Sequence, residues 1–353
     1  MHRFISVCIG LTISNYDYDC LTRVFSRGGF VGFFLGRAKS GLAPGAIFCL
    51  GVVAALLRSD LAIPEAIAKG LSLYLMLAIG FKGGVAASEH GLGWDLAILV
   101  GAAMALSFTI PLIAFFLLRL TTRISRIDAA AIAAHYGSIS IVTFIAATAV
   151  VEAAGLTFPG IMVAAAAAME VPAIASALFL ARSGRTGEQV STGQTSWREV
   201  MLNGSVLLLV GAFVIGMATG KTGYADISPF IVDPFKGVLC LFLLDMGLVA
   251  GRELWQVRKV LSPALLAFGL YMPPIGGLLG ALMGGLLGIG HGGTALLAVL
   301  SASASYIAVP AAMRLALPEA KPSLYLTLSL AVTFPFNLTV GIPIYIALAG
   351  WLS

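Results

Sequence analysis

The feature that most constrains this chain is a succession of long apolar segments, each about as long as a bilayer is thick. A membrane-spanning helix needs about 20 apolar residues, with a range of roughly 17 to 25. In lipid, only helices and closed barrels satisfy every backbone group, and segments of this length favour helices. Charged residues make up only 10% of the 353 residues, against about a quarter in soluble domains. The sequence therefore predicts an all-α polytopic membrane protein.

The apolar segments follow one another with short polar or basic connections between them. Their number predicts about ten transmembrane helices. The predicted spans are 41–57, 66–86, 95–118, 128–151, 156–181, 200–219, 232–251, 260–289, 293–313 and 322–351.

The basic residues predict how these spans cross the membrane. Most Arg and Lys residues lie in the connections after odd-numbered spans, whereas those after even-numbered spans hold little beyond Lys221 and Lys236. Positively charged loops stay in the cytoplasm, so we expect both ends of the ten-span core outside a cell inner membrane (the plasma membrane). The net charge of +5 is spread over loops rather than gathered on one face, which argues against binding of nucleic acid.

The spans divide into two halves on either side of a polar stretch. We predict a first five-helix repeat over 41–182, a cytoplasmic linker over 183–198 and a second five-helix repeat over 199–353. Residues 1–40 form a basic N-terminal extension to which the sequence assigns no role.

A shift of 167 residues relates landmarks of the two halves. Gly80 falls on Gly247, and Glu170 falls on Asn337. The same shift places Ser138 on Ser305. Because each half has an odd number of spans, the second must be inverted relative to the first. Inverted repeats with a binding site at their interface are typical of secondary transporters.

The fourth and ninth spans each carry a polar cluster at mid-membrane, at 135–143 and 301–310. Their Gly, Ser and Pro residues favour broken helices. The N–H groups at the start of a half-helix, together with hydroxyls, make a ready site for a small anion. The alternative is that each hydroxyl bonds back to its own helix, but two clusters at equivalent positions favour the anion site. The candidate substrate-binding residues are Ser138, Ser140, Ser303, Ser305 and Tyr306.

Ionisable and amide side chains near the middle of other spans suggest a cation site. Glu170 and Asn337 each lie close to a proline, and a carboxylate at this depth is costly unless it is paired, hydrated or bound to a cation. A structural hydrogen bond between half-helices is the alternative. We expect sodium as the coupling ion, with no other metal and no organic cofactor. The candidate cation-binding residues are Thr143, Glu170, Asp245 and Asn337.

Enzyme signatures are missing from the sequence. It contains neither HExxH nor GxSxG, and its four cysteines have no metal-binding or redox spacing. We therefore expect no enzymatic activity.

Several segments carry a resemblance to one transporter family. They are LRSDLAIPEAI (57–67), LMLAIGFKGG (75–84), Ser140 with Thr143, MEVPA (169–173) and SASASYIAVPAAMR (301–314). With them the chain resembles the SbtA-type sodium-dependent bicarbonate transporter family over about 41–351. The resemblance implies a five-plus-five inverted fold, a homotrimer and bicarbonate held between facing half-helix N-termini of spans four and nine, with sodium beside it. It also implies a PII-like regulator on the cytoplasmic side.

The sequence thus predicts a secondary active transporter for sodium-coupled uptake of a small anion, with bicarbonate as the best candidate. One alternative is a symporter or exporter of another small anion, which competition between anions would reveal. The other is a non-transporting membrane sensor, which predicts saturable anion binding without flux.

Overall fold

The computed structural model describes residues 43–90, 93–182 and 204–353, apart from 307, 308, 311, 312, 314–316 and 318. Within this part of the chain every regular element is a helix, and seven helices are long and apolar enough to cross a membrane. The all-helical, multi-pass class is confirmed, and the count of ten spans stays a prediction. The predicted N-terminal extension and linker lie outside the described residues.

The helices lie where the apolar segments are, with breaks inside three of the predicted spans. Pro322–Leu352 is one continuous helix that includes two π-helical stretches, η1 and η2. The elements are α4 (Ala43–Leu56), α5 (Glu65–His90), α6 (Trp94–Thr121), α7 (Arg126–Gly137), α8 (Ile141–Ala153), α9 (Met162–Ala168), α10 (Glu170–Arg182), α12 (Gly204–Ile231), α13 (Phe235–Val260), α14 (Pro263–Leu287), α15 (Gly290–Ala302), α17 (Pro322–Leu326), η1 (Thr327–Thr333), α18 (Phe334–Phe336), η2 (Asn337–Gly341) and α19 (Ile342–Leu352).

Local sequence signals set several helix ends. Ser125 and Ser262 cap the starts of α7 and α14, each accepting a hydrogen bond from a backbone N–H three residues later. Gly288 ends α14 in the left-handed conformation that glycine adopts without strain. Gly220, with φ 56°, kinks α12 one residue after the end of the predicted sixth span.

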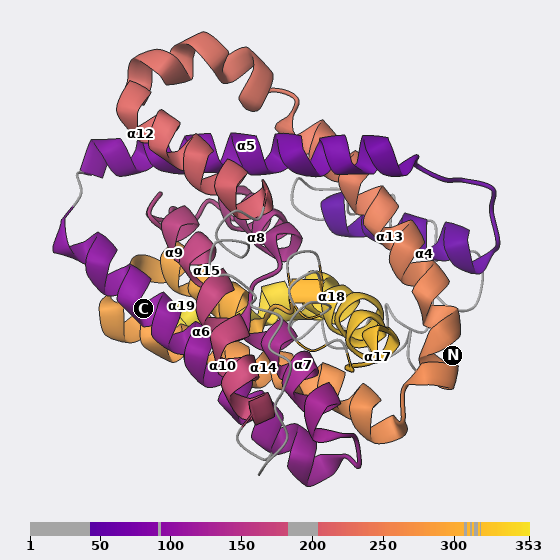
Figure 1. Cartoon of the computed structure of the whole chain (residues 1–353). Coiled ribbons are helices and arrows are strands. Elements are labelled where there is room, and N and C mark those ends of the chain that lie inside the picture. Colours follow the sequence, from indigo (N-terminus) through magenta and orange to yellow (C-terminus); the bar gives the residue numbers. More distant parts are fainter. Residues whose placement is uncertain are drawn as a thin grey trace, which may run out of the picture.

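Four helices, α4, α5, α12 and α13, form a group that we call the four-helix group. α5 lies against α12, and α4 lies against α13 (Figure 1). Glycines allow the backbones to touch: a Cβ at Gly84 would lie 1.9 Å from the carbonyl oxygen of Phe213, and one at Gly247 would lie 2.2 Å from that of Phe48. Close approach of this kind is how helices associate in lipid, where the hydrophobic effect contributes little between them.

The remaining helices, α6–α10, α14, α15 and α17–α19, form the broken-helix group. Its centre is α7 and α8, whose most apolar stretch is entirely enclosed by other parts of the protein. α6, α10 and α17 pack on α7, while α15 packs against both α8 and α14. The described residues of the two polar clusters predicted from the sequence therefore lie in the interior of this group rather than at its lipid-facing surface.

Candidate functional site

The first break lies between α7 and α8, inside the predicted cluster 135–143. Ser138 and Ser140 have extended backbone conformations, with ψ of 159° and 106°, so the helix stops at Gly137 and restarts at Ile141. Gly137 is required here because a Cβ would lie 2.1 Å from a ring carbon of Pro111 in α6. The prediction of a broken helix is confirmed at this place.

The second break begins at the end of α15, inside the predicted cluster 301–310. Ser303 is extended, with φ −80° and ψ 161°, and the following residues up to Ser305 are also outside any helix. On α14, Gly276 lets the chain approach closely, since a Cβ there would lie 2.1 Å from the carbonyl oxygen of Ser301. This break too lies where the sequence predicts it.

The two breaks touch each other. The N–H of Ser140 donates to the Ser303 hydroxyl at 2.9 Å, and the N–H of Ser305 donates to the His135 carbonyl at 2.8 Å. Ser138 and Ser303 occupy the same position, the first residue after a half-helix. These two residues are 165 positions apart. The 167-residue shift between the two halves, which pairs Ser138 with Ser305, stays a prediction.

The start of α8 points free hydrogen-bond donors into the first break. The hydroxyl of Ser140 accepts from the Thr143 N–H at 3.2 Å and from the Thr143 hydroxyl at 2.9 Å, as an N-cap does. Among the described residues, nothing accepts from the N–H groups of Ile141 and Val142, although both residues are buried. Free N–H groups at a helix start carry partial positive charge.

Glu170 contacts the first break from a neighbouring helix. It is the first residue of α10 and is buried, and its carboxylate accepts a hydrogen bond from the Ser138 hydroxyl at 2.5 Å. The junction between α9 and α10 is itself held by the Ser107 hydroxyl, which donates to the Met169 carbonyl. No basic side chain hydrogen-bonds to Glu170 within the described part of the chain.

Asn337 makes the corresponding contact at the second break. Its side-chain amide donates to the carbonyl of Ala302, the last residue of α15, at 2.8 Å. Its amide oxygen accepts from the Tyr345 hydroxyl at 3.0 Å. Glu170 and Asn337 therefore each hydrogen-bond to the end of a half-helix, as expected if they have a structural role instead of binding a cation. The second carboxylate oxygen of Glu170 makes no such bond and remains available to a cation.

Tyr306 directly follows the second break, whereas Asp245 makes no contact with either break that the described residues show. The Tyr306 ring packs on Phe334 with centroids 5.2 Å apart, and its hydroxyl lies 3.8 Å from the sulfur of Met246. Asp245 precedes Met246 on α13 and is buried, but in the described part of the chain it makes no hydrogen bond to any of the other predicted site residues.

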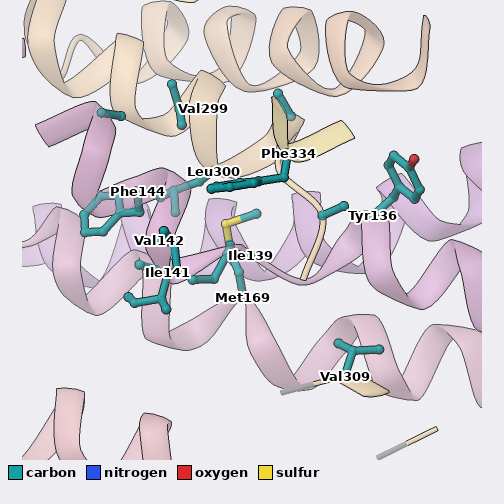
Figure 2. Packing of buried hydrophobic residues seen from close by; sticks show 14 of the residues in the cluster. Tyr136, Ile139, Ile141, Val142, Phe144, Met169, Val299, Leu300, Val309 and Phe334 are labelled. Carbon is teal, nitrogen blue, oxygen red and sulfur yellow. The ribbon is translucent and has the colours of Figure 1, made fainter. Parts of the chain in front are cut away.

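An apolar wall surrounds this polar centre. Figure 2 shows buried side chains from several elements gathered around the first break, including Ile139 within the break itself, Met169 between α9 and α10, and Phe334. A wall of this kind excludes water, and each hydrogen bond and charge inside it therefore acts more strongly than it would in solution.

Two residues at the site make contacts that the sequence does not predict. The sequence marks His135 only as part of a polar cluster, and Tyr345 carries no signal at all. The Tyr345 hydroxyl reaches Asn337 from eight residues away along the chain, across the π-helical stretch η2. Regular α-helical periodicity does not predict that contact.

Comparison of the sequence with models of known families gives a match. The sequence model of a family described as the Na⁺-dependent bicarbonate transporter superfamily matches residues 45–350. A search of curated proteins finds no match to the chain.

Proposed function

This chain belongs to the Na⁺-dependent bicarbonate transporter superfamily, and we propose that it couples uptake of a small anion, bicarbonate first among candidates, to sodium. The family supports transport as the activity. The identity of the anion and the coupling to sodium are our inferences from the site.

The proposal rests on the start of α8, which is buried inside the protein. Two buried N–H groups, those of Ile141 and Val142, lack acceptors among the described residues and lie at the break next to Ser303. Buried N–H donors without a partner cost free energy unless a ligand accepts hydrogen bonds from them. A small planar anion such as bicarbonate supplies acceptors and is favoured by the helix dipole.

For sodium we propose the oxygens around Glu170. Its carboxylate is the one acidic group that contacts a break within the described residues, and the Ser138 hydroxyl bound to it adds a neutral oxygen. The Thr143 hydroxyl, which donates to Ser140 at the same break, is the further neutral oxygen that we propose. A cation here would offset the cost of the buried carboxylate. Asn337 supplies the matching polar group at the second break. Asp245 stays a weaker candidate.

The arrangement of the helices supports a ten-span fold of two inverted halves. Gly80 approaches Leu209 and Gly84 approaches Phe213, so α5 and α12 run parallel. Gly247 approaches Phe48 and Gly251 approaches Val52, so α4 and α13 also run parallel. In terms of the predicted spans, the second lies beside the sixth, and the first lies beside the seventh. We infer that transport moves the four-helix group against the broken-helix group.

Uptake of radiolabelled bicarbonate into proteoliposomes tests the proposal. An inward sodium gradient should raise the initial rate well above that in sodium-free vesicles and in empty liposomes. Equal uptake with and without sodium would contradict the coupling, and competition by other anions would identify a different substrate. Saturable bicarbonate binding with no flux would favour a sensor.

Removing the N-cap of α8 should weaken substrate binding. Ser140→Ala loses both hydrogen bonds that Ser140 accepts from Thr143, and loss of an N-cap costs about 1 kcal/mol, or roughly fivefold in affinity. We expect the KM for the anion to rise by about that factor. Ser262→Ala is the matched control, because it removes the N-cap of α14. An equal rise in KM for both variants would show a general loss of stability instead.

An ion pair joins the two helix groups. Lys82 of α5 lies 3.3 Å from Glu152 of α8, and both side chains are partly exposed. Such a pair contributes little to stability, typically less than about 1 kcal/mol. It does link the surfaces that must move, so Lys82→Gln and Glu152→Gln should each change the maximal uptake rate about two- to fivefold while the KM stays constant.

A double variant checks this interpretation of the Lys82–Glu152 pair. If the pair acts as one unit, Lys82→Gln with Glu152→Gln should have no larger effect than either change alone. Additive effects on the maximal rate would show that the two residues act independently.

A further inference from the structure

His135 is the one histidine that the structure places at the breaks, among the residues it describes. It lies in the last turn of α7 and is completely buried. Its ring stacks on the ring of Tyr325 in α17, with centroids 4.6 Å apart and an angle of 26° between the planes. The stacking holds the plane of the His135 ring, and its hydrogen bonds decide which way the two ring nitrogens point.

His135 and Ser305 are joined by two hydrogen bonds of opposite direction. The Ser305 N–H donates to the carbonyl of His135 at 2.8 Å. The Nδ1 atom of His135 lies 2.5 Å from the Ser305 carbonyl oxygen. Because a carbonyl can only accept, Nδ1 must carry the proton and donate it. Both backbone polar groups of Ser305 are thus satisfied by a residue 170 positions earlier in the chain.

This double contact matters because Ser305 lies in the extended segment after α15. Outside a helix, the buried N–H and carbonyl groups of such a residue need partners from elsewhere. Ser305 is the third residue after the end of α15, as Ser140 is the third residue after the end of α7, and its hydroxyl makes no hydrogen bond to a described residue. Its position therefore fixes how the segment after α15 lies against the first break.

The other ring nitrogen of His135, Nε2, also supports a proton on Nδ1. Nε2 is buried and has no hydrogen-bond partner among the described residues. In neutral histidine one nitrogen donates and the other accepts. The ring is therefore neutral with its proton on Nδ1, and it is committed to the contact with Ser305 rather than shared between two partners.

We propose that His135 is a positioning residue, which holds Ser305 and the second break in register with the first break and so sets the affinity for the anion. The proposal rests on the proposed function, because it assigns the anion to the space between these breaks. His135 acts through Ser305 and need not touch the anion itself.

Two substitutions of His135 separate hydrogen bonding from volume. The side-chain amide of Asn lies at the δ position, so His135→Asn keeps a donor near the place of Nδ1, whereas the longer His135→Gln carries its amide at the ε position. We expect His135→Gln to raise the KM for bicarbonate about tenfold, the equivalent of one lost buried hydrogen bond, with His135→Asn within about twofold of the wild type. The maximal rate per folded transporter should change less than the KM.

The experiment measures sodium-driven bicarbonate uptake by wild type and both variants, scaled to the monodisperse protein recovered. Equal KM values for wild type and His135→Gln, with normal wild-type uptake, would overturn the positioning role and leave the proposed function intact. A larger effect of His135→Asn than of His135→Gln would overturn it too, by showing that ring volume matters instead. Absence of sodium-driven uptake in the wild type would contradict the proposed function itself.

Nitrogen NMR of histidine-labelled protein tests the contact without any transport. The chain has four histidines, so the resonances that disappear in His135→Asn identify this ring. We expect a protonated Nδ1 and an unprotonated Nε2. The opposite tautomer, or a ring protonated on both nitrogens at neutral pH, would overturn the assignment.

Discussion

Replacing Glu170 with Gln should abolish most sodium-stimulated uptake. Gln keeps an oxygen that can accept the hydrogen bond from Ser138 but removes the negative charge. Loss of the charged partner of a buried cation costs about 2–5 kcal/mol, so the sodium concentration for half-maximal uptake should rise by roughly 30-fold or more. The measurement is the initial rate of bicarbonate uptake over a series of sodium concentrations.

Two further variants make the Glu170 experiment decisive. Glu65→Gln is the matched control, because Glu65 also lies in the first turn of a helix but is exposed. Glu170→Asp keeps the charge on a shorter side chain and should retain part of the sodium dependence. If Glu170→Gln showed the wild-type response to sodium, Glu170 would be only a structural partner of Ser138, and the cation would have to bind elsewhere.

Gly84→Ala should destabilise the protein strongly, although it adds only one methyl group. The new Cβ would lie 1.9 Å from the carbonyl oxygen of Phe213 and 2.8 Å from the N–H nitrogen of Met217, both in the backbone of α12. Backbone atoms cannot rotate away, so α5 and α12 must separate. Overpacking of this kind costs about 1–3 kcal/mol or more, which exceeds the gain of about 1 kcal/mol from placing Ala in a helix.

Gly211→Ala is the matched control for Gly84→Ala. Gly211 lies in α12, and an added Cβ there would meet nothing within 4 Å. We expect its unfolding temperature in detergent to equal or exceed that of the wild type, while that of Gly84→Ala falls clearly below it. Wild-type stability of Gly84→Ala would show that α5 and α12 are farther apart than the structure places them.

The fold was largely predictable because lipid leaves few solutions. Apolar length alone located the helices, and the Gly and Ser residues around Ser138 and Ser303 located both breaks. What the sequence could not provide was the exact residue at which each half-helix ends. A single shift of 167 residues pairs Glu170 with Asn337, whereas the ends of α7 and α15, at Gly137 and Ala302, are 165 residues apart. Connections of different length between helices change the shift along the chain, and only coordinates show where.

The site was predictable in its residue types but not in its partnerships. Burial at mid-membrane singled out Glu170 and Asn337, yet nothing in the sequence indicated that one binds Ser138 and the other the carbonyl of Ala302. Asp245 satisfied the same criterion of depth, but within the described residues it makes no hydrogen bond to the other predicted site residues. Depth in the membrane can be inferred from one span, whereas a contact depends on how two spans are rotated.

The π-helical stretches of the last span have a consequence for how this protein can vary. Each π turn holds about one residue more than an α turn, which is the trace that a one-residue insertion leaves in a helix. One residue corresponds to a rotation of about 100°. Because η1 precedes Asn337, changing the residue count there would turn the amide away from Ala302 while leaving the length of the span almost unchanged. Among relatives, the length of this stretch should therefore be conserved more strictly than its residues.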